Sequence, residues 1–439
     1  MAKSAVWQLC TTLLCGLALP SAQAGMGNLG TSYGLMPQDV ATAQGLSMFT
    51  EEVSATYYNP SYITADERGE LTAGILHAEQ ELRTTRSDAR GNVLANAPTQ
   101  HVLLGFKSNL ASLTRDRHPI HVGIILGLEK YGKEMMAFRS ETSDTGQYLQ
   151  FGKQPMFLNA GVGTGIADGV SIGASVRLTL KASAELEAHT TLAGDMSQES
   201  LTVNAKPSLK AILGTTIEPA KLFCDDACIW DGWELALIYR TKSSSSTSVE
   251  ADVVVNKTVP EPGLSLAVTT IEAFQPETYA VGLQYSGERW RTAVSLEQQR
   301  WSELVEEFAG DTIKDQAELP PSERIQFDDV LSPRVGAEYQ LNETYSVSGG
   351  LAYETSPLRT ERNPGLNYYD TDRAVFGLGF AAVYNRTPVF SYPVRLDFAY
   401  QYQQLIDRDF LIVDGSGNET SVAADGDIHV VSTSITFKF

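Results

Sequence analysis

The segment Val170–Leu186 alternates between apolar and polar positions, and this pattern constrains the fold more than any other feature. Every second residue from Val170 to Leu186 is apolar, and the residues between them are serine, threonine, glycine or charged. Successive side chains of a β-strand point to opposite faces, so this pattern predicts a strand with one apolar face. Similar alternation recurs in Trp233–Thr241 and Tyr392–Tyr402. We therefore expect an all-β protein.

The alternating segments are longer than the strands of globular sheets, which usually have about five or six residues. A soluble sandwich would alternate as well, but strands of about 9–11 tilted residues suit a bilayer. We expect fourteen strands, with these approximate bounds: Gly69–Arg83, Thr99–Ser112, Ile120–Lys130, Met156–Ala167, Val170–Leu186, Leu201–Thr215, Trp233–Thr241, Glu277–Tyr285, Trp290–Gln299, Arg324–Tyr339, Tyr345–Tyr353, Arg373–Tyr384, Tyr392–Tyr402 and Gly426–Phe439.

The connections between these strands alternate in length. Turns such as Asp168-Gly169 follow the even strands, whereas long connections such as Tyr131–Pro155 and Lys242–Pro276 follow the odd ones. The 216–232 connection is an exception, because it is long for a periplasmic turn. Short turns at one end and long loops at the other indicate an outer-membrane barrel. The pattern predicts a 14-stranded antiparallel transmembrane β-barrel over residues 69–439, with both ends of the barrel on the periplasmic side.

The two ends of the chain indicate export to the outer membrane. Lys3, the apolar run Leu9–Leu19 and the Ala22-Gln23-Ala24 site predict a signal peptide over residues 1–24. After it, no uncharged apolar run reaches the roughly 18 residues of a membrane-spanning helix. The last alternating residues end on Phe439, which resembles the assembly signal of bacterial outer-membrane barrels. The expected partners are therefore the barrel assembly machinery, outer-membrane lipid and lipopolysaccharide.

Charge and cysteine content exclude some partners. The chain has 33 Lys and Arg against 53 Asp and Glu, and its formal net charge is −20. Without a basic patch, nucleic acid is not an expected partner. Beyond the signal peptide only Cys224 and Cys228 remain. An oxidising compartment favours a disulfide between them, and the alternative is a reduced pair. No histidine lies near them, so no metal site is predicted.

Residues 25–68 do not read as strand, although they contain the aromatic stretch EEVSATYYNPSYI at positions 51–63. A barrel of about fourteen strands is too wide to be filled by its own side chains, so it holds water or a plug. Glycines gather on predicted inward faces, at positions Gly161, Gly163, Gly165, Gly377 and Gly379. We therefore expect residues 25–68 to fold into the lumen as a plug, and the alternative is a disordered periplasmic tail.

The same N-terminal segment resembles a known family. Ala41–Gly45 and Val53–Ser61 are similar to the N-terminal hatch of the FadL/TodX outer-membrane transporters of long-chain fatty acids and hydrocarbons. Asn59-Pro60-Ser61 has serine where that family has alanine, and Ala352–Pro357 and Leu237–Thr241 resemble further family motifs. The resemblance implies a Gram-negative outer-membrane barrel with a hatch motif of Gly45, Asn59, Pro60 and Ser61. It also implies lateral release through a gap in the wall.

Two sets of residues are candidates for ligand contact. The outer loop after the seventh strand is unusually apolar, which suggests contact with a hydrophobic ligand, and the alternative is a small core within the loop. Its candidate residues are Val253, Val255, Leu264, Leu266, Ile271 and Phe274. A fatty-acid carboxylate would need a cation, for which Arg177 and Lys181 are candidates. The alternative for these two is a lumen salt bridge with Glu185 or with acids of the plug.

Enzymatic function is not indicated, because HExxH, GxSxG and SxxK signatures are absent and the six histidines are scattered. No catalytic residues, metal or cofactor are therefore predicted. We expect passive transport of hydrophobic compounds across the outer membrane, with long-chain fatty acids ahead of alkanes and aromatic hydrocarbons. The alternatives are an adhesion barrel whose loops bind a surface partner, and a general porin.

Overall fold

The computed structural model describes most of the chain beyond its first 31 residues. The described ranges are 32–86, 89–92, 98–111, 119–130, 133–140, 143–153, 156–181, 183–192, 195–204, 208–224, 228–253, 264–304, 326–359, 362–363, 370–413 and 419–439. The expected signal peptide lies outside them. Among these residues, no helix combines the length and apolar character needed to cross a membrane.

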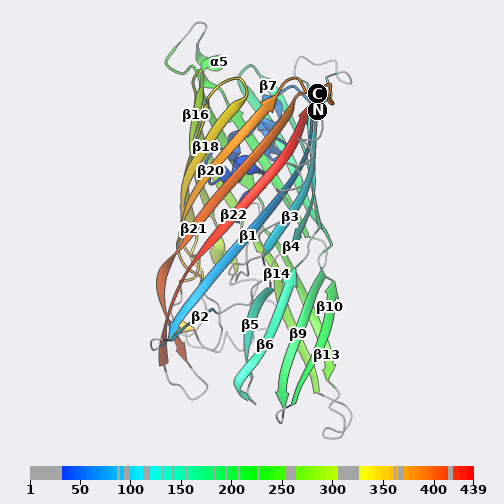
Figure 1. The fold of residues 1–439 in the computed structure, drawn as a ribbon, viewed down its shortest axis with the longest axis vertical. Coiled ribbons are helices and arrows are strands. Elements are labelled where there is room, and N and C mark those ends of the chain that lie inside the picture. The colour runs from blue at the N-terminus through cyan, green and yellow to red at the C-terminus, as the bar shows by residue number, and fades with distance from the viewer. Residues whose placement is uncertain are drawn as a thin grey trace, which may run out of the picture.

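Fourteen of the strands form one closed antiparallel barrel (Figure 1). Each strand pairs with its neighbours along the sheet, and β22 pairs with both β1 and β21 to close the wall. The barrel strands are β1 (Glu70–Arg86), β3 (Thr99–Asn109), β4 (His121–Lys130), β7 (Met156–Ala167), β8 (Val170–Lys181), β11 (Ser208–Ile217), β12 (Trp233–Arg240), β15 (Thr278–Ser286), β16 (Trp290–Gln299), β17 (Val330–Gln340), β18 (Tyr345–Glu354), β20 (Arg373–Tyr384), β21 (Val394–Val413) and β22 (Glu419–Lys438).

The two faces of the wall differ in chemistry, as the period-two pattern predicts. Buried and exposed residues alternate regularly along β3 and β15. The exposed positions carry large apolar side chains, for example Leu104 at 54%, Leu213 at 52% and Leu378 at 68% exposure. Apolar side chains on the outside of a barrel suit contact with lipid. The buried positions face the lumen and include charged residues such as Lys107 and Arg240.

The long connections differ from the sequence-based prediction, because several contain strands. The expected loop 131–155 holds β5 (Lys133–Ser140) and β6 (Ser143–Lys153), and 242–276 holds β13 (Ser243–Val253) and β14 (Leu264–Gln275). The single strand predicted over Val170–Leu186 is two strands, because β8 ends at Lys181 and β9 (Ser183–Leu192) joins a separate sheet.

These additional strands form two sheets outside the barrel wall, at the end opposite the N- and C-terminal labels (Figure 1). One sheet has the order β10-β9-β6-β5, with β10 spanning Asp195–Asn204, and the other is the β13–β14 hairpin. Two short strands, β2 (Ala89–Asn92) and β19 (Arg362–Asn363), pair with β1 and β21. We refer to this end as the hairpin end and to the other as the terminal end.

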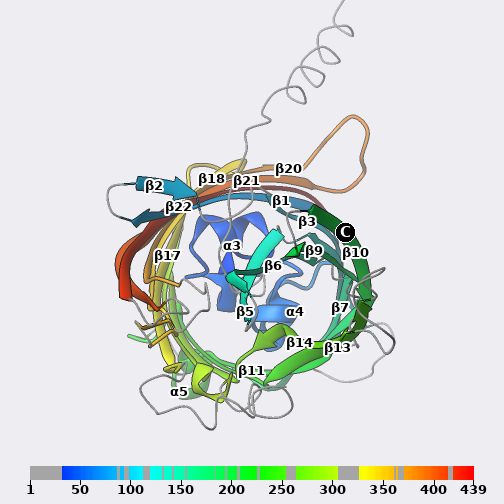
Figure 2. The ribbon, with the colours of Figure 1, turned by 90° about the horizontal axis from the view of Figure 1, so that it is seen from below.

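The segment before β1 lies inside the barrel, where Figure 2 shows α3 and α4 within the ring of strands. Its elements are α3 (Pro37–Ala41), η1 (Ser47–Phe49), α4 (Ala55–Tyr58) and η2 (Pro60–Ala65). Of the remaining short helices, α5 (Pro219–Phe223) follows β11, and η3 (Trp301–Glu303) follows β16. We call residues 32–68 the hatch. Almost all of its residues from 33 to 63 are buried.

Candidate functional site

The backbone of the hatch contacts the backbone of the wall directly at several glycines. A Cβ added to Gly350 would collide with the Thr42 backbone, and one added to Gly377 would collide with the Ala41 carbonyl. On the far side of the lumen, Gly173 would meet the Pro60 backbone in the same way. Glycine permits such backbone approach because it has no Cβ. Of the five glycines predicted to face inward, Gly161, Gly163, Gly377 and Gly379 lie against the hatch, and Gly165 stands at a register shift near the end of β7.

The turn after α3 is strained where it contacts the wall. Ala43 and Gln44 both have positive φ angles, 47° and 63°. Such angles are uncommon for residues other than glycine and are maintained only when surrounding contacts enforce them. Here the next residue, Gly45, is packed against the backbone of Val335 and Gly336 in β17. The wall therefore determines the conformation of this part of the hatch.

Asn59 organises the opposite half of the hatch. Its Nδ2 donates hydrogen bonds to the Met48 carbonyl at 2.9 Å and to Thr216 Oγ1 at 3.0 Å. Its Oδ1 accepts from Ser61 Oγ at 2.6 Å and from the Ser61 backbone N–H at 3.2 Å. Ser61 Oγ also lies 2.7 Å from Thr216 Oγ1. Both polar atoms of the buried amide are thus satisfied, and they connect two hatch segments to β11.

Pro60 follows Asn59 as the first residue of η2. Its fixed φ suits the start of a helix, where a backbone N–H would have no partner within the helix. Its backbone lies against Gly173, as described above, and its carbonyl lies against Gly163 of β7. The structure therefore brings Asn59, Pro60 and Ser61 together at one side of the wall. Gly45, the fourth residue of the predicted hatch motif, packs instead against β17.

An aromatic and cationic cluster contacts the hatch from β8 and β12. The Arg177 guanidinium lies 3.7 Å from the centroid of the Phe157 ring and 5.5 Å from that of Tyr57. Arg240 lies 5.4 Å from the same Tyr57 ring, and its Nη2 donates to the Tyr58 carbonyl at 3.3 Å. Cation–π contacts are strongest when desolvated, as here. Both arginines therefore bind α4 directly.

Three lumen arginines are paired with carboxylates of the wall. Arg177 Nη2 lies 2.8 Å from Glu129 Oε1, and Arg240 Nη1 lies 2.8 Å from Glu297 Oε2. Further along the wall, Arg334 Nη2 lies 2.6 Å from Glu354 Oε1. The sequence-based hypothesis for Arg177 is a ligand for a fatty-acid carboxylate, with a lumen salt bridge to Glu185 or to acids of the plug as the alternative. The structure pairs Arg177 with Glu129, a partner that the sequence did not indicate.

Seven of the predicted site residues either have only their backbone described or lie outside the described residues. Lys181 is the last residue of β8, and its side chain is not described. Val255 lies outside the described part of the chain. Val253 is opposite Leu264 in the β13–β14 hairpin. In the same register, Leu266, Ile271 and Phe274 lie on β14 at the hairpin end.

Two buried carboxyl groups of the hatch, those of Asp39 and Glu52, have raised pKa values. Burial raises the pKa of Asp39 to about 6, although its carboxylate accepts hydrogen bonds from Ser47 Oγ at 2.6 Å and the Met36 N–H at 3.0 Å. Burial also raises the pKa of Glu52, and Arg395 at 3.3 Å partly opposes that rise. Desolvation disfavours the charged form of an acid. Protonation of these groups therefore favours the buried position of the hatch.

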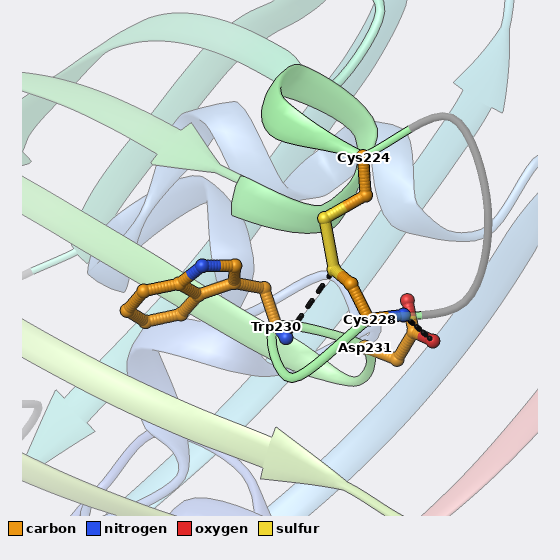
Figure 3. The surroundings of a disulfide bond; sticks show 4 residues. All are labelled: Cys224, Cys228, Trp230 and Asp231. Carbon is orange, nitrogen blue, oxygen red and sulfur yellow. Dashed lines mark hydrogen bonds between the residues drawn. A yellow bond between two sulfur atoms is a disulfide. The ribbon is translucent and has the colours of Figure 1, made fainter.

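Cys224 and Cys228 form a disulfide at the terminal end of the barrel (Figure 3). Cys224 follows α5, which begins with Pro219 after β11. The Asp231 carboxylate accepts a hydrogen bond from the Cys228 N–H at 2.9 Å, and Cys228 Sγ lies 3.4 Å from the Trp230 backbone nitrogen. The bond closes part of the long connection that sequence analysis marked as an exception.

Several residues that hold the hatch carry no distinguishing signal in the sequence. Thr216, Arg240 and Arg291 act through contacts between distant segments, and Arg291 Nη1 donates to the Phe49 carbonyl at 3.1 Å. Gln401 Nε2 likewise donates to the Val40 carbonyl at 2.9 Å. Period two places these residues on the inward face, but only the register of the closed barrel shows which part of the hatch each one meets.

Comparisons with known proteins agree with this architecture. Residues 269–439 match the family described as outer membrane protein transport protein (OMPP1/FadL/TodX). Alkane uptake protein A of Marinobacter nauticus is 62% identical over 424 residues, which cover 96% of this chain and 94% of the relative.

Two solved structures share the fold at low sequence identity. A Pseudomonas aeruginosa FadL homologue is 14% identical with a TM-score of 0.64, covering 92% of this chain and 98% of the homologue. The Pseudomonas putida toluene transporter TodX is 14% identical with a TM-score of 0.55, covering 96% and 99%. The closed barrel, the hatch within it and the extensive identity to a curated relative together show that this chain belongs to the OMPP1/FadL/TodX family of outer-membrane transport proteins.

Proposed function

We propose that this protein takes up alkanes passively across the outer membrane, by movement of the hatch away from the glycine-lined wall. The curated relative that is 62% identical is named an alkane uptake protein, and an identity of this extent favours a shared substrate class. Alkanes dissolve poorly in water and well in lipid, so their transfer into the membrane is favourable without an energy source. The difficult step is passage through the polar surface layer.

The observation that carries the proposal is that three arginines of the hatch-filled lumen are already paired with carboxylates. Arg177, Arg240 and Arg334 face the lumen, and each contacts a carboxylate. A fatty-acid carboxylate would have to compete with these pairs and would add an uncompensated charge, which is costly in a desolvated site. An uncharged hydrocarbon needs no counter-charge. The absence of a charge on the substrate therefore favours alkanes over long-chain fatty acids, although the sequence-based prediction puts long-chain fatty acids first.

We further propose that the β13–β14 hairpin and its sequence candidates are the first contact for substrate at the hairpin end. Its apolar residues Leu264, Leu266, Ile271 and Phe274 would receive the alkane before it reaches the hatch. Substitution of Leu266 and Ile271 by serine is expected to lower alkane uptake at limiting concentration and to leave uptake at saturation nearly unchanged. If the variant and the wild type take up alkane equally at all concentrations, the hairpin does not contact the substrate during uptake.

Lateral release is the proposed exit, with the wall at β4 and β7 as the place. The hatch residue Thr56 lies against Gly123 of β4 and Gly161 of β7, so movement of the hatch would leave a hollow against bare backbone. The β4–β7 ladder is continuous from His121–Gly163 to Leu128–Met156, so exit there requires the two strands to separate.

A disulfide across this seam tests the exit. Ile124 and Ala160 are register partners on the lipid side, and replacing both by cysteine would lock β4 to β7. Alkane uptake is expected to fall when the bond is oxidised and to recover on reduction. Val294 and Val335 form the matched pair on the β16–β17 seam, where the same lock is expected to have no effect. Equal uptake by both oxidised variants would refute exit at β4–β7.

The transport proposal itself is tested in a deletion strain that has no redundant homologue. Growth on hexadecane and uptake of labelled alkane are expected to be lost and to return with the wild-type gene. Labelled oleate is measured in parallel, because restoration of oleate uptake alone would favour the fatty-acid alternative. Uptake of alkane at the wild-type rate in the deletion strain would refute the proposal.

A further inference from the structure

The connection between β11 and β12 exposes apolar side chains to an unusual extent. We call the described residues of this connection, 218–224 and 228–232, the disulfide turn. Phe223 is 76% exposed and Ile229 is 83% exposed, and Leu222 and Trp230 are exposed at 40% and 46%. Contiguous exposed apolar surface marks a site of interaction with a protein or a membrane. None of these four residues contributes to the hatch contacts described above.

The disulfide turn is held in place at several points, so the exposure is not a consequence of a loose loop. The Cys224–Cys228 bond closes it internally. Its first residue donates from the Glu218 N–H to the Gly169 carbonyl of the β7–β8 turn at 2.8 Å. Its last residue accepts at the Gly232 carbonyl from the Ser286 N–H at 2.8 Å. The turn therefore presents its apolar side chains from a fixed frame, with little ordering left to occur on binding.

The turn adjoins wall strands that carry aromatic side chains at this end of the barrel. Directly after the turn, the Trp233 ring lies 5.1 Å from Tyr285, which lies 5.3 Å from Trp290, centroid to centroid. Trp290 is 47% exposed on the outside of β16. Tryptophan and tyrosine gather where a bilayer meets water, because their rings are amphipathic. The wall beyond them carries Leu213 and Leu237, both exposed.

Exposed apolar residues also occur on other turns at the terminal end. Leu341 follows β17 at 47% exposure, and Val389 precedes β21 at 80% exposure. A protein partner of ordinary size would cover one patch, whereas a lipid leaflet surrounds the entire barrel. Figure 1 places α5 at the same end as the C-terminus, at the rim of the wall.

We propose that the disulfide turn is a lipid anchor, whose residues Leu222, Phe223, Ile229 and Trp230 insert into the periplasmic leaflet of the outer membrane. In this position the side chains contact phospholipid acyl chains and the interfacial region of the leaflet. The disulfide fixes the depth at which the side chains enter. Because the turn begins just after Thr216, the anchor also holds in place the wall segment to which Asn59 is bonded.

Fluorescence quenching by brominated lipid tests the anchor in the full-length protein. Wild type and Trp230→Phe are reconstituted into vesicles of phosphatidylcholine or of its dibrominated form, and the difference in emission gives the Trp230 contribution. We expect bromination to remove more than half of that contribution and aqueous iodide to remove little. Trp290→Phe supplies the matched control, since Trp290 lies on the lipid-facing wall and its contribution must also be quenched.

The opposite pattern would overturn the proposal. If the Trp230 contribution is unchanged by brominated lipid and is quenched by iodide, the turn lies in water and its apolar surface serves a soluble partner instead. A second position guards against a local effect of the substitution. Phe223→Trp in the Trp230→Phe background is expected to show the same lipid quenching, and iodide quenching at position 223 would likewise contradict the anchor.

Discussion

Replacing Asn59 with alanine should open the hatch without unfolding the barrel. The substitution removes four hydrogen bonds, to Met48, to Thr216 and two from Ser61. Each is worth about 0.5–1.5 kcal/mol net, and the existing contact between Ser61 and Thr216 offsets part of the loss. We therefore expect the seated hatch to lose about 2–4 kcal/mol, which raises the open fraction by about 30- to 900-fold.

Planar-bilayer conductance of the purified protein measures that fraction directly. Asn59→Ala is expected to show frequent openings where the wild type is almost silent, with unchanged heat-modifiable migration as evidence of an intact barrel. Asn342→Ala is the matched control, because Asn342 caps an exposed turn by accepting from the Thr344 and Tyr345 N–H groups. Conductance of Asn59→Ala equal to that of the wild type and Asn342→Ala would refute the view that this amide network seats the hatch.

Three further perturbations follow from the same contacts. Pro60→Ala should alter alkane uptake or leak conductance while the barrel still reaches the outer membrane, and loss of the barrel from membrane fractions would count against it. Gly350→Ala should displace the hatch at Thr42 and raise leak conductance, whereas Gly349→Ala, whose added Cβ meets only ordinary contacts, should not. Acidification from pH 7 to pH 4 should reduce leak by up to about 100-fold, because the pKa of Asp39 is raised to about 6 in the seated hatch. Seating is then favoured below that value and weakened as pH rises through it, and Asp39→Asn should reduce the pH dependence.

The barrel could be predicted from sequence because period two is a local signal. The bounds of β7 and β20 agree with the prediction, since each inward or outward position is set by its immediate neighbours. The strands of the β13–β14 hairpin could not be predicted in the same way, because the local sequence of β13 does not alternate. The sequence of β13, SSSSTSVEADV, begins with a run of serines and lacks regular alternation, so the local pattern gave no strand signal.

The arrangement of the candidate site could be predicted only in part. The hatch segment and its Asn59-Pro60-Ser61 turn were identified from aromatic content, proline and family resemblance. Its elements were not, because α3 has five residues and α4 has four, too few for a helical period to be visible. Arg240 pairs with Glu297 across β15, so the lumen ion pairs depend on three-dimensional register rather than on spacing in the sequence.

The glycine contacts determine how the lumen must open. A side chain that blocks a channel can rotate away within nanoseconds, whereas segment motion takes microseconds to milliseconds. At Gly350 and Gly173 the hatch meets the wall backbone to backbone, so no rotamer change creates space there. The hatch must instead shift as connected segments, with Asn59 as the contact that is released. Single-channel openings of Asn59→Ala should therefore last microseconds or longer. Unresolved nanosecond flicker would indicate that side chains, and not the hatch, form the gate.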